Sequence, residues 1–182
     1  MTVAEIVPLD ASRLAALHGF LDRLPEYDRT FIKEDVHNHA VAERWVYDPG
    51  SARHWVAVRE SAVCGLVLVV PLAGWSAHVG ELRLVVDPEL RGRGLGRAMA
   101  RHALRSAAEM GLSKLVVEVV AEQQGAVSMF DALGFRGEAL LSAYIRDRTG
   151  QLRDLLVLAH DVGEEWAAIA SLGIPDDLAE TG

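Results

Sequence analysis

The stretch from Gly80 to Met110 constrains the fold of this chain more than any other. An apolar strand pattern leads to Asp87-Pro88, where proline removes a backbone donor and restricts the residue before it, so we predict that the strand ends there. A turn rich in glycine and arginine follows. From Leu95 the apolar residues recur with helical spacing, which predicts a helix as far as Met110. The order of strand, glycine-rich turn and helix predicts an anion-binding site.

The physical basis of this prediction is the N-terminus of the helix. There the first backbone N–H groups lack partners and the helix carries partial positive charge, and a phosphate group satisfies both. Glycine places no side chain in the way and adopts conformations that turn several N–H groups inward, while arginine adds positive charge. The turn therefore predicts a phosphate site made of Arg91, Gly92, Arg93, Gly94, Leu95, Gly96 and Arg97.

Two common phosphate-binding motifs fit this turn poorly. A Walker loop needs a Lys-Ser or Lys-Thr pair after its last glycine, whereas Gly96 is followed by Arg97-Ala98. A dinucleotide fingerprint has G-x-G-x-x-G close behind its strand, whereas five residues separate Val86 from Gly92 here and Arg97 takes the third glycine position. Glu118, at the end of the next strand pattern, could still imitate a ribose-binding acid. A nucleotide-dependent oxidoreductase therefore stays as an alternative.

A third phosphate-binding motif fits better. The pattern Arg-x-x-Gly-x-Gly, formed by Arg91, Gly94 and Gly96 behind the sequence VVDP, resembles the pyrophosphate-binding motif of the GNAT acetyltransferase family. A second segment, residues 122–135, resembles the later helix of that family and ends in its Leu-Gly-Phe signature. Two motifs in the right order and spacing, covering roughly residues 62–161, are much more specific than either motif alone.

The resemblance implies an α+β fold with three layers (α-β-α), in which a mixed central sheet of about seven strands has helices on both faces. Two middle parallel strands would part at their ends and leave a cleft for the pantetheine arm of an acyl-CoA. The resemblance also implies an N-acetyltransferase that uses acetyl-CoA as co-substrate and no metal, with direct attack by a primary amine in a ternary complex. The acceptor is a small-molecule amine or a protein amine.

The catalytic groups are expected near the strand that precedes the turn. The resemblance implies that a backbone N–H near Val85 or Val86 stabilises the oxyanion of the tetrahedral intermediate. A carboxylate would accept the proton of the amine, directly or through one water. Glu81 is the first candidate because it lies on this strand, where the family often has an acidic base. Glu118, on the neighbouring predicted strand, is the second.

The second motif departs from the family pattern at two positions expected to contact the cofactor. Phe130 stands where the family often has a tyrosine that protonates the departing CoA, and Gln123 stands where asparagine is common. An ordinary thiol has a pKa of about 8.5, so loss of this acid would weaken turnover without preventing it. Tyr144 or Ser128 could substitute for the tyrosine. A catalytically weak or inactive acyl-CoA-binding module is therefore the main alternative to an enzyme.

The remaining patterns predict a single domain over residues 1–162, followed by a short helix and a frayed tail over residues 163–182. Residues 26–35 are polar without clear periodicity and predict a loop or a broken helix. Besides the strand before the glycine-rich turn, strands are predicted at 3–8, 54–59, 62–70, 114–120, 136–146 and 152–160. Helices are predicted from Asp10 or Ser12 to Leu24 and over 36–47, 95–110 and 123–133.

Composition and charge disfavour several classes of protein. Of the 182 residues, 51% are hydrophobic, and the net charge of −8 disfavours nucleic-acid and anionic-membrane partners. No apolar run approaches the roughly 20 residues of a membrane helix, and the N-terminus lacks the order of a signal peptide. Because Cys64 is the single cysteine, no disulfide can form within the chain, and we expect a cytoplasmic protein. A homodimer is one possible state. His37, His39 and His54 complete no recognised metal-binding set.

Overall fold

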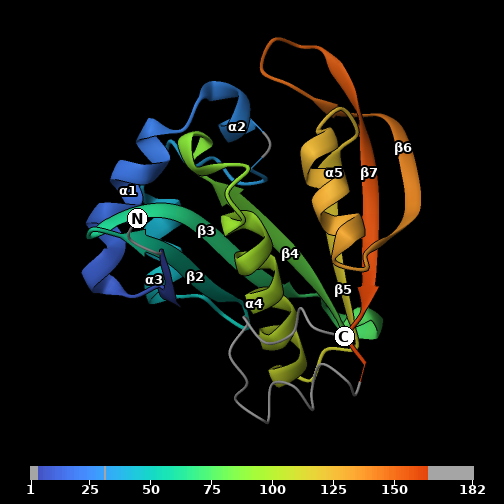
Figure 1. Cartoon of the computed structure of the whole chain (residues 1–182), viewed down its shortest axis with the longest axis horizontal. Coiled ribbons are helices and arrows are strands. Elements are labelled where there is room, and N and C mark those ends of the chain that lie inside the picture. The colour runs from blue at the N-terminus through green and yellow to red at the C-terminus, as the bar shows by residue number, and fades with distance from the viewer. Residues whose placement is uncertain (1–3, 31, 164–182) are drawn as a thin grey trace.

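The computed structural model describes residues 4–30 and 32–163, which form a seven-stranded mixed sheet and five α-helices (Figure 1). Among these residues, no helix is both long and apolar enough to cross a membrane. The strands are β1 Glu5–Pro8, β2 Arg53–Arg59, β3 Ala62–Pro71, β4 Val79–Val86, β5 Lys114–Val120, β6 Arg136–Arg146 and β7 Leu152–Asp161. The α-helices are α1 Leu14–Arg23, α2 Glu26–Thr30, α3 Ala40–Tyr47, α4 Leu95–Glu109 and α5 Gln124–Ala132.

The strands follow the order β1-β2-β3-β4-β5-β7-β6 across the sheet. β4 and β5 run parallel, and all the other neighbouring pairs are antiparallel. A parallel pair needs a long crossover connection, which α4 provides between β4 and β5. This mixed sheet with its helices confirms the predicted fold class.

The parallel strands β4 and β5 are paired along only part of their length. Their register runs from Val79 opposite Lys114 to Leu82 opposite Val117. β4 nevertheless continues to Val86, and β5 continues to Val120. Over these last residues each strand stays paired on its outer side, β4 with β3 and β5 with β7. The two strands therefore part at their carboxyl ends, as the family resemblance implied.

Helices cover both faces of the sheet. On one face, α4 and α5 pack over its middle, where Met99 of α4 and Leu82 of β4 belong to the same buried cluster. On the other face, α1 and α3 cover β2 and β3, where Phe20 of α1 packs with Leu68 of β3 (Figure 1). Because β3 is covered on both sides, its residues from Val63 to Val69 are all buried. This double coverage explains why its sequence is apolar throughout and does not alternate.

The segment between α1 and α3 differs from the prediction. α3 begins at Ala40 and not at Val36. The side chains of Asp35 and Asn38 accept hydrogen bonds from backbone N–H groups two residues later, at 3.3 and 3.1 Å, and such bonds compete with helix formation. Within residues 26–35, α2 is a short helix of five residues. The short terminal helix and tail predicted for residues 163–182 fall almost entirely outside the described residues.

Candidate functional site

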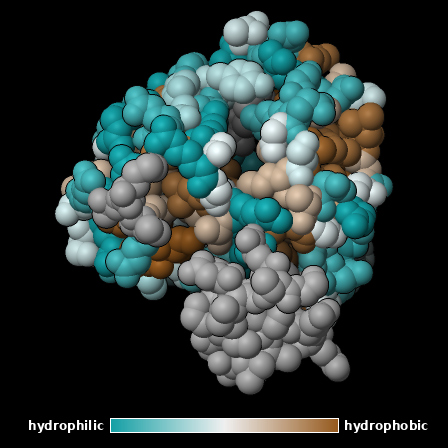
Figure 2. Space-filling view, in the orientation of Figure 1, coloured by the Kyte–Doolittle hydropathy of each residue, from teal (hydrophilic) through white to brown (hydrophobic). Residues whose placement is uncertain are grey.

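A cavity of about 980 Å³ lies where β4 and β5 part. Its walls come from α2 and the segment that follows it, from β4 and β5, from the glycine-rich turn (residues 91–97), and from α5 and β6. Figure 2 shows a hollow on this face of the molecule, bordered mainly by hydrophilic residues. The two motifs that are separate in the sequence therefore line one cavity.

The backbone of β4 presents alternate residues to the gap between the parted strands. The N–H of Asp87 donates to the carbonyl of Cys64 at 2.9 Å, and the N–H of Leu72 donates to the carbonyl of Val79 at 2.9 Å. Because bonded pairs alternate in an antiparallel ladder, Val85 directs its N–H toward β3. Val86 directs its N–H toward the gap. Of the two predicted oxyanion donors, only Val86 has a backbone N–H on the side of the cavity.

The glycine-rich turn leaves the N-terminus of α4 open. Gly92 has a φ of 70° and Gly94 a φ of 84°, a region that side chains other than glycine rarely adopt. Gly94 is the N-cap of α4 and supplies no side-chain hydrogen bond to the first turn of the helix. A Cβ atom at either glycine would have no neighbour within 4 Å, so both face open space. This geometry suits an anion that approaches the helix N-terminus.

Arg91 fastens this turn to two other elements. Its Nη2 lies 2.9 Å from Oδ2 of Asp28 on α2, and the Asp28 side chain is only 8% exposed. Its Nε and Nη2 each donate to the carbonyl of Val86 at 3.2 Å. Arg91 and Arg97 line the cavity, whereas Arg93 and Leu95 are not among the described lining residues. Arg91 therefore has a bracing role that its place in the motif did not reveal.

The residues predicted on α5 and β6 also reach the cavity. Gln123 lines it as the N-cap of α5, and its side chain makes no capping bond. Phe130 is 3% exposed, and its ring packs edge-on against Phe135 with the centroids 5.1 Å apart. Tyr144 lines the cavity from β6 beside Ala143, whose φ of 52° coincides with a register shift in β6. The shift explains why strand alternation alone could not place this tyrosine.

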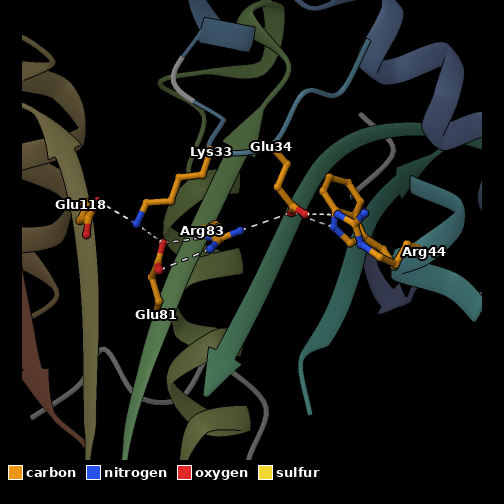
Figure 3. Close-up of polar contacts among 7 residues, drawn as sticks. Lys33, Glu34, Arg44, Glu81, Arg83 and Glu118 are labelled. Atoms are coloured by element: carbon orange, nitrogen blue, oxygen red, sulfur yellow. Dashed lines mark hydrogen bonds and ion pairs between the residues drawn. The ribbon is translucent and has the colours of Figure 1, made fainter. Parts of the chain in front are cut away.

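The two predicted carboxylates lie on the same face of the sheet and share one cation (Figure 3). The Nζ atom of Lys33, from the segment after α2, lies 2.8 Å from Oε1 of Glu81 and 2.8 Å from Oε2 of Glu118. Nε of Arg83 donates to Oε1 of Glu81 at 2.9 Å, and its Nη2 lies 3.4 Å from Oε2. The structure therefore brings both predicted bases together and fills the space between them with an ammonium group.

A further carboxylate, Glu34, continues this group of charges toward α3. Its Oε2 lies 3.3 Å from Nη1 of Arg83 and accepts a hydrogen bond from the indole N–H of Trp45 at 2.9 Å. Its Oε1 lies 2.5 Å from Nη2 of Arg44 (Figure 3). We refer to Lys33, Glu34, Arg44, Glu81, Arg83 and Glu118 as the charge network.

The charge network sets the protonation of its own members. Burial raises the pKa of the Glu81 carboxyl, but hydrogen bonds from Arg83 and Lys33 and their positive charges outweigh it, so this pKa lies below its ordinary value. Burial lowers the pKa of the Lys33 ammonium, but hydrogen bonds to Glu118 and Glu81 outweigh it, so this pKa lies above its ordinary value. At neutral pH, Glu81 is therefore ionised and Lys33 is charged.

Sequence reasoning named no individual residue of the segment 26–34 as part of the site. Asp28, Lys33 and Glu34 all come from this polar segment, which has no periodicity to indicate which side chains point inward. Only its density of charge distinguished it. Among residues 4–30 and 32–163, no group of His, Cys, Asp and Glu side chains is placed to hold a metal ion.

A mixed sheet with parted central strands and an open helix N-terminus at their ends is the architecture that the resemblance to the GNAT family implied. The sequence profile of the Acetyltransferase (GNAT) family matches residues 18–135 of the chain. The chain belongs to this family.

Individual relatives agree with this assignment. The "Uncharacterized N-acetyltransferase YjgM" of Escherichia coli (strain K12) is 32% identical over 91 residues, which are 50% of this chain and 54% of that protein. The chain spans about half the length of the curated relatives it matches. A GCN5-related N-acetyltransferase from Kribbella flavida has a TM-score of 0.75 at 23% identity, covering 87% of this chain and 98% of that one.

A second solved structure has the same fold. The spermidine N-acetyltransferase of Vibrio cholerae, in complex with CoA and spermine, has a TM-score of 0.73 at 18% identity, covering 90% of this chain and 97% of that one. At this level of identity the likeness shows the fold.

Gly94→Val should weaken binding of acetyl-CoA at least 10-fold, on the order of 1.4 kcal/mol. The branched side chain of valine is strained at the φ of 84° that Gly94 adopts, and it would cover the open N–H groups of α4. Titration calorimetry measures the affinity. Gly150→Val is the matched control, because Gly150 has a φ of 85° and open space around it but lies in the turn between β6 and β7. Equal affinities for the two variants would contradict a phosphate site at the turn.

The stability of the protein should fall below neutral pH because of His54. Burial lowers the pKa of His54 from 6.5 to about 4, although the charge of Glu34 opposes this. In the unfolded chain the imidazole of His54 binds a proton near pH 6.5, whereas in the folded chain it does so only near pH 4. Because the unfolded state binds the proton first, the free energy of unfolding decreases as the pH falls through this window. The contribution lost between pH 7 and pH 5 is about 2 kcal/mol. Urea denaturation at the two pH values measures it.

His54→Phe should reduce this loss, because phenylalanine keeps an aromatic ring beside Trp45 and binds no proton. His39→Gln is the control, since His39 is exposed and paired with Asp22 at 3.2 Å. If His54→Phe loses as much stability between pH 7 and pH 5 as the unmodified protein, buried His54 is not the cause.

Proposed function

We propose that the protein transfers an acetyl group from acetyl-CoA to a primary amine by direct attack in a ternary complex. One observation carries this proposal: a single cavity connects the open N-terminus of α4 to the carboxylates of Glu81 and Glu118. A donor bound at one end and an amine bound at the other would meet where the strands part.

The donor half of the cavity supplies backbone groups for each part of acetyl-CoA. The diphosphate would accept hydrogen bonds from the first N–H groups of α4 and from the glycine-rich turn, with Arg97 adding charge. The amides of the pantetheine arm would pair with the inner edge of β4, which lacks a partner strand beyond Leu82. The Vibrio cholerae spermidine N-acetyltransferase of the same fold was solved with CoA, which supports this assignment.

The reaction joins the amine nitrogen to the thioester carbon and breaks the carbon–sulfur bond. As the nitrogen attacks, negative charge develops on the carbonyl oxygen, and the N–H of Val86 is the donor we assign to it. Such a donor is typically worth about 2.7 to 4 kcal/mol. The CoA thiolate then leaves, and a thiolate is a tolerable leaving group near neutral pH because an ordinary thiol has a pKa of about 8.5.

We assign the general base to Glu118 in preference to Glu81. Glu81 receives hydrogen bonds from Arg83 and Lys33, and its lowered pKa makes it a weak proton acceptor. Glu118 forms an ion pair with Lys33, and the Glu118 side chain is 29% exposed. Glu118 is therefore more available for the proton of an incoming amine, while Glu81 would hold the substrate in place.

Protonation of the departing thiolate falls to a group other than Phe130, which has no acidic proton. Tyr144 lines the same cavity, and we propose it as the acid. If no such acid acts, the second candidate function is an acyl-CoA-binding module with weak or no turnover, which the buried Phe130 favours. Both functions use the same donor half of the cavity.

Amine-dependent release of CoA tests this function. With acetyl-CoA present, a thiol reagent should detect CoA release that rises with added primary amine and saturates. A panel of monoamines, polyamines, amino acids and lysine peptides covers both small-molecule and protein acceptors. Tight binding of acetyl-CoA without turnover over the whole panel would favour the binding module. Binding of NADP in place of acetyl-CoA would overturn both functions.

Glu118→Gln should lower kcat/KM about 100-fold at pH 7, as expected for loss of a general base, and activity should partly recover at high pH where the amine loses its own proton. Steady-state kinetics across pH measures both effects. Glu138→Gln, at a surface ion pair with Lys114, is the control and should leave the kinetics unchanged. A loss from Glu81→Gln that exceeds the loss from Glu118→Gln, with the same pH recovery, would move the base to Glu81.

A further inference from the structure

The ammonium group of Lys33 lies between two carboxylates. Its Nζ is 2.8 Å from each of the two carboxylates, and those carboxylates belong to different strands, β4 and β5. The lysine itself comes from neither strand but from the segment between α2 and α3, and its side chain is 39% exposed (Figure 3). A cation carried by a peripheral segment thus occupies the space between the two candidate bases.

The charge network needs one cation at this position. Its three carboxylates, Glu34, Glu81 and Glu118, face three cations, Lys33, Arg44 and Arg83. The Glu81 side chain is only 13% exposed. Removing the ammonium of Lys33 would leave a partly buried carboxylate pair with excess negative charge, which is unfavourable unless another cation replaces it.

The three cations of the charge network differ in how easily a ligand could displace them. Arg83 is fixed by contacts with two carboxylates, and Arg44 contacts Glu34 beside the indole of Trp45. Lysine carries a single charge at the end of a flexible four-carbon stem. Partial exposure gives the Lys33 side chain a path into solvent. Lys33 is therefore the cation that an entering ligand can displace.

We propose that Lys33 is an internal substitute for the acceptor, and that the acceptor is a cationic primary amine whose ammonium group displaces Lys33 from between Glu81 and Glu118. This inference rests on the proposed function, since it identifies the acceptor class of the same cavity. Lys33 then acts as a specificity residue: an amine that carries a positive charge restores the charge balance, whereas a neutral or anionic ligand does not.

The opposite role for Lys33 would be to bind an acidic acceptor together with Arg83. The distances disfavour it, because both cations already contact carboxylates at 2.8 and 2.9 Å. The two roles predict effects of opposite sign when the charge of Lys33 is removed. Loss of a competing cation strengthens binding of a cationic ligand, whereas loss of a binding group weakens binding of an anionic one.

The test uses n-butylamine, which reproduces the side chain of lysine, and butanoate, its anionic counterpart. Each is titrated at pH 7 into the chain of 182 residues and followed by NMR chemical shifts, without acyl donor. If Lys33 fills its position at least nine-tenths of the time, Lys33→Met should bind n-butylamine at least 10-fold more tightly than the unmodified protein. Lys33→Arg keeps the charge and is the matched control, with affinity close to that of the unmodified protein.

Two results would overturn this role for Lys33. One is an unchanged or weaker affinity of Lys33→Met for n-butylamine. The other is a weaker affinity of Lys33→Met for butanoate, which would assign Lys33 to an acidic acceptor. The double variant Lys33→Met with Glu118→Gln should lose the gain, because one of the two carboxylates is then neutral. Thermal unfolding confirms that each variant is folded.

This experiment separates the inference from the proposed function. Tighter binding of n-butylamine to Lys33→Met, with no acetylation of any amine in the panel when acetyl-CoA is added, would support the cation site and reject the transferase. Acetylation of amines by the unmodified protein, with no gain in affinity for Lys33→Met, would support the transferase and reject the role of Lys33.

Discussion

The candidate site depends on the parting of β4 and β5 beyond Leu82 and Val117. Unpaired backbone groups inside a protein are unfavourable, and strands seldom leave them open. Here β3 and β7 hold the outer edges of the two strands, so the sheet stays intact while its middle opens. The cavity that results exposes backbone donors such as the N–H of Val86 to a ligand. The same opening gives Glu118, one residue beyond the last pair, access to that cavity.

The two ends of the cavity have different electrostatic character. At one end, the glycine-rich turn and the N-terminus of α4 present N–H groups and arginines, which suits an anion. At the other end, carboxylates on β4 and β5 hold a cation. The polar segment after α1 contacts both ends, through Asp28 to Arg91 and through Lys33 to the carboxylates. It is also tied to the turn between β6 and β7, where Arg148 lies 2.8 Å from Glu26.

Local sequence patterns predicted the helices and strands well where the backbone preference of a residue and the hydrophobic pattern around it favour the same structure. Proline after Asp87 ends β4, glycine at 94 precedes α4, and the apolar run of β3 reflects burial on both faces. The prediction failed where local hydrogen bonds compete with helix formation. The side chains of Asp35 and Asn38 accept such bonds, and α3 therefore begins later in the chain than its apolar pattern predicts. Tyr144 was named as a candidate acid, but strand alternation alone could not place its side chain, since the register shift between Leu141 and Ile145 changes which side of β6 faces the cavity.

The sequence by itself determined the strand, the glycine-rich turn and the helix that form the donor end, because proline, glycine and helical periodicity act over a few residues. It also indicated Glu81 and Glu118 as the acidic candidates. Only the tertiary structure decided that these two carboxylates share Lys33, that Val86 and not Val85 faces the gap, and that Arg91 is bound to Asp28. Each of these depends on strand register or on contacts between residues distant in the chain, which no local pattern encodes.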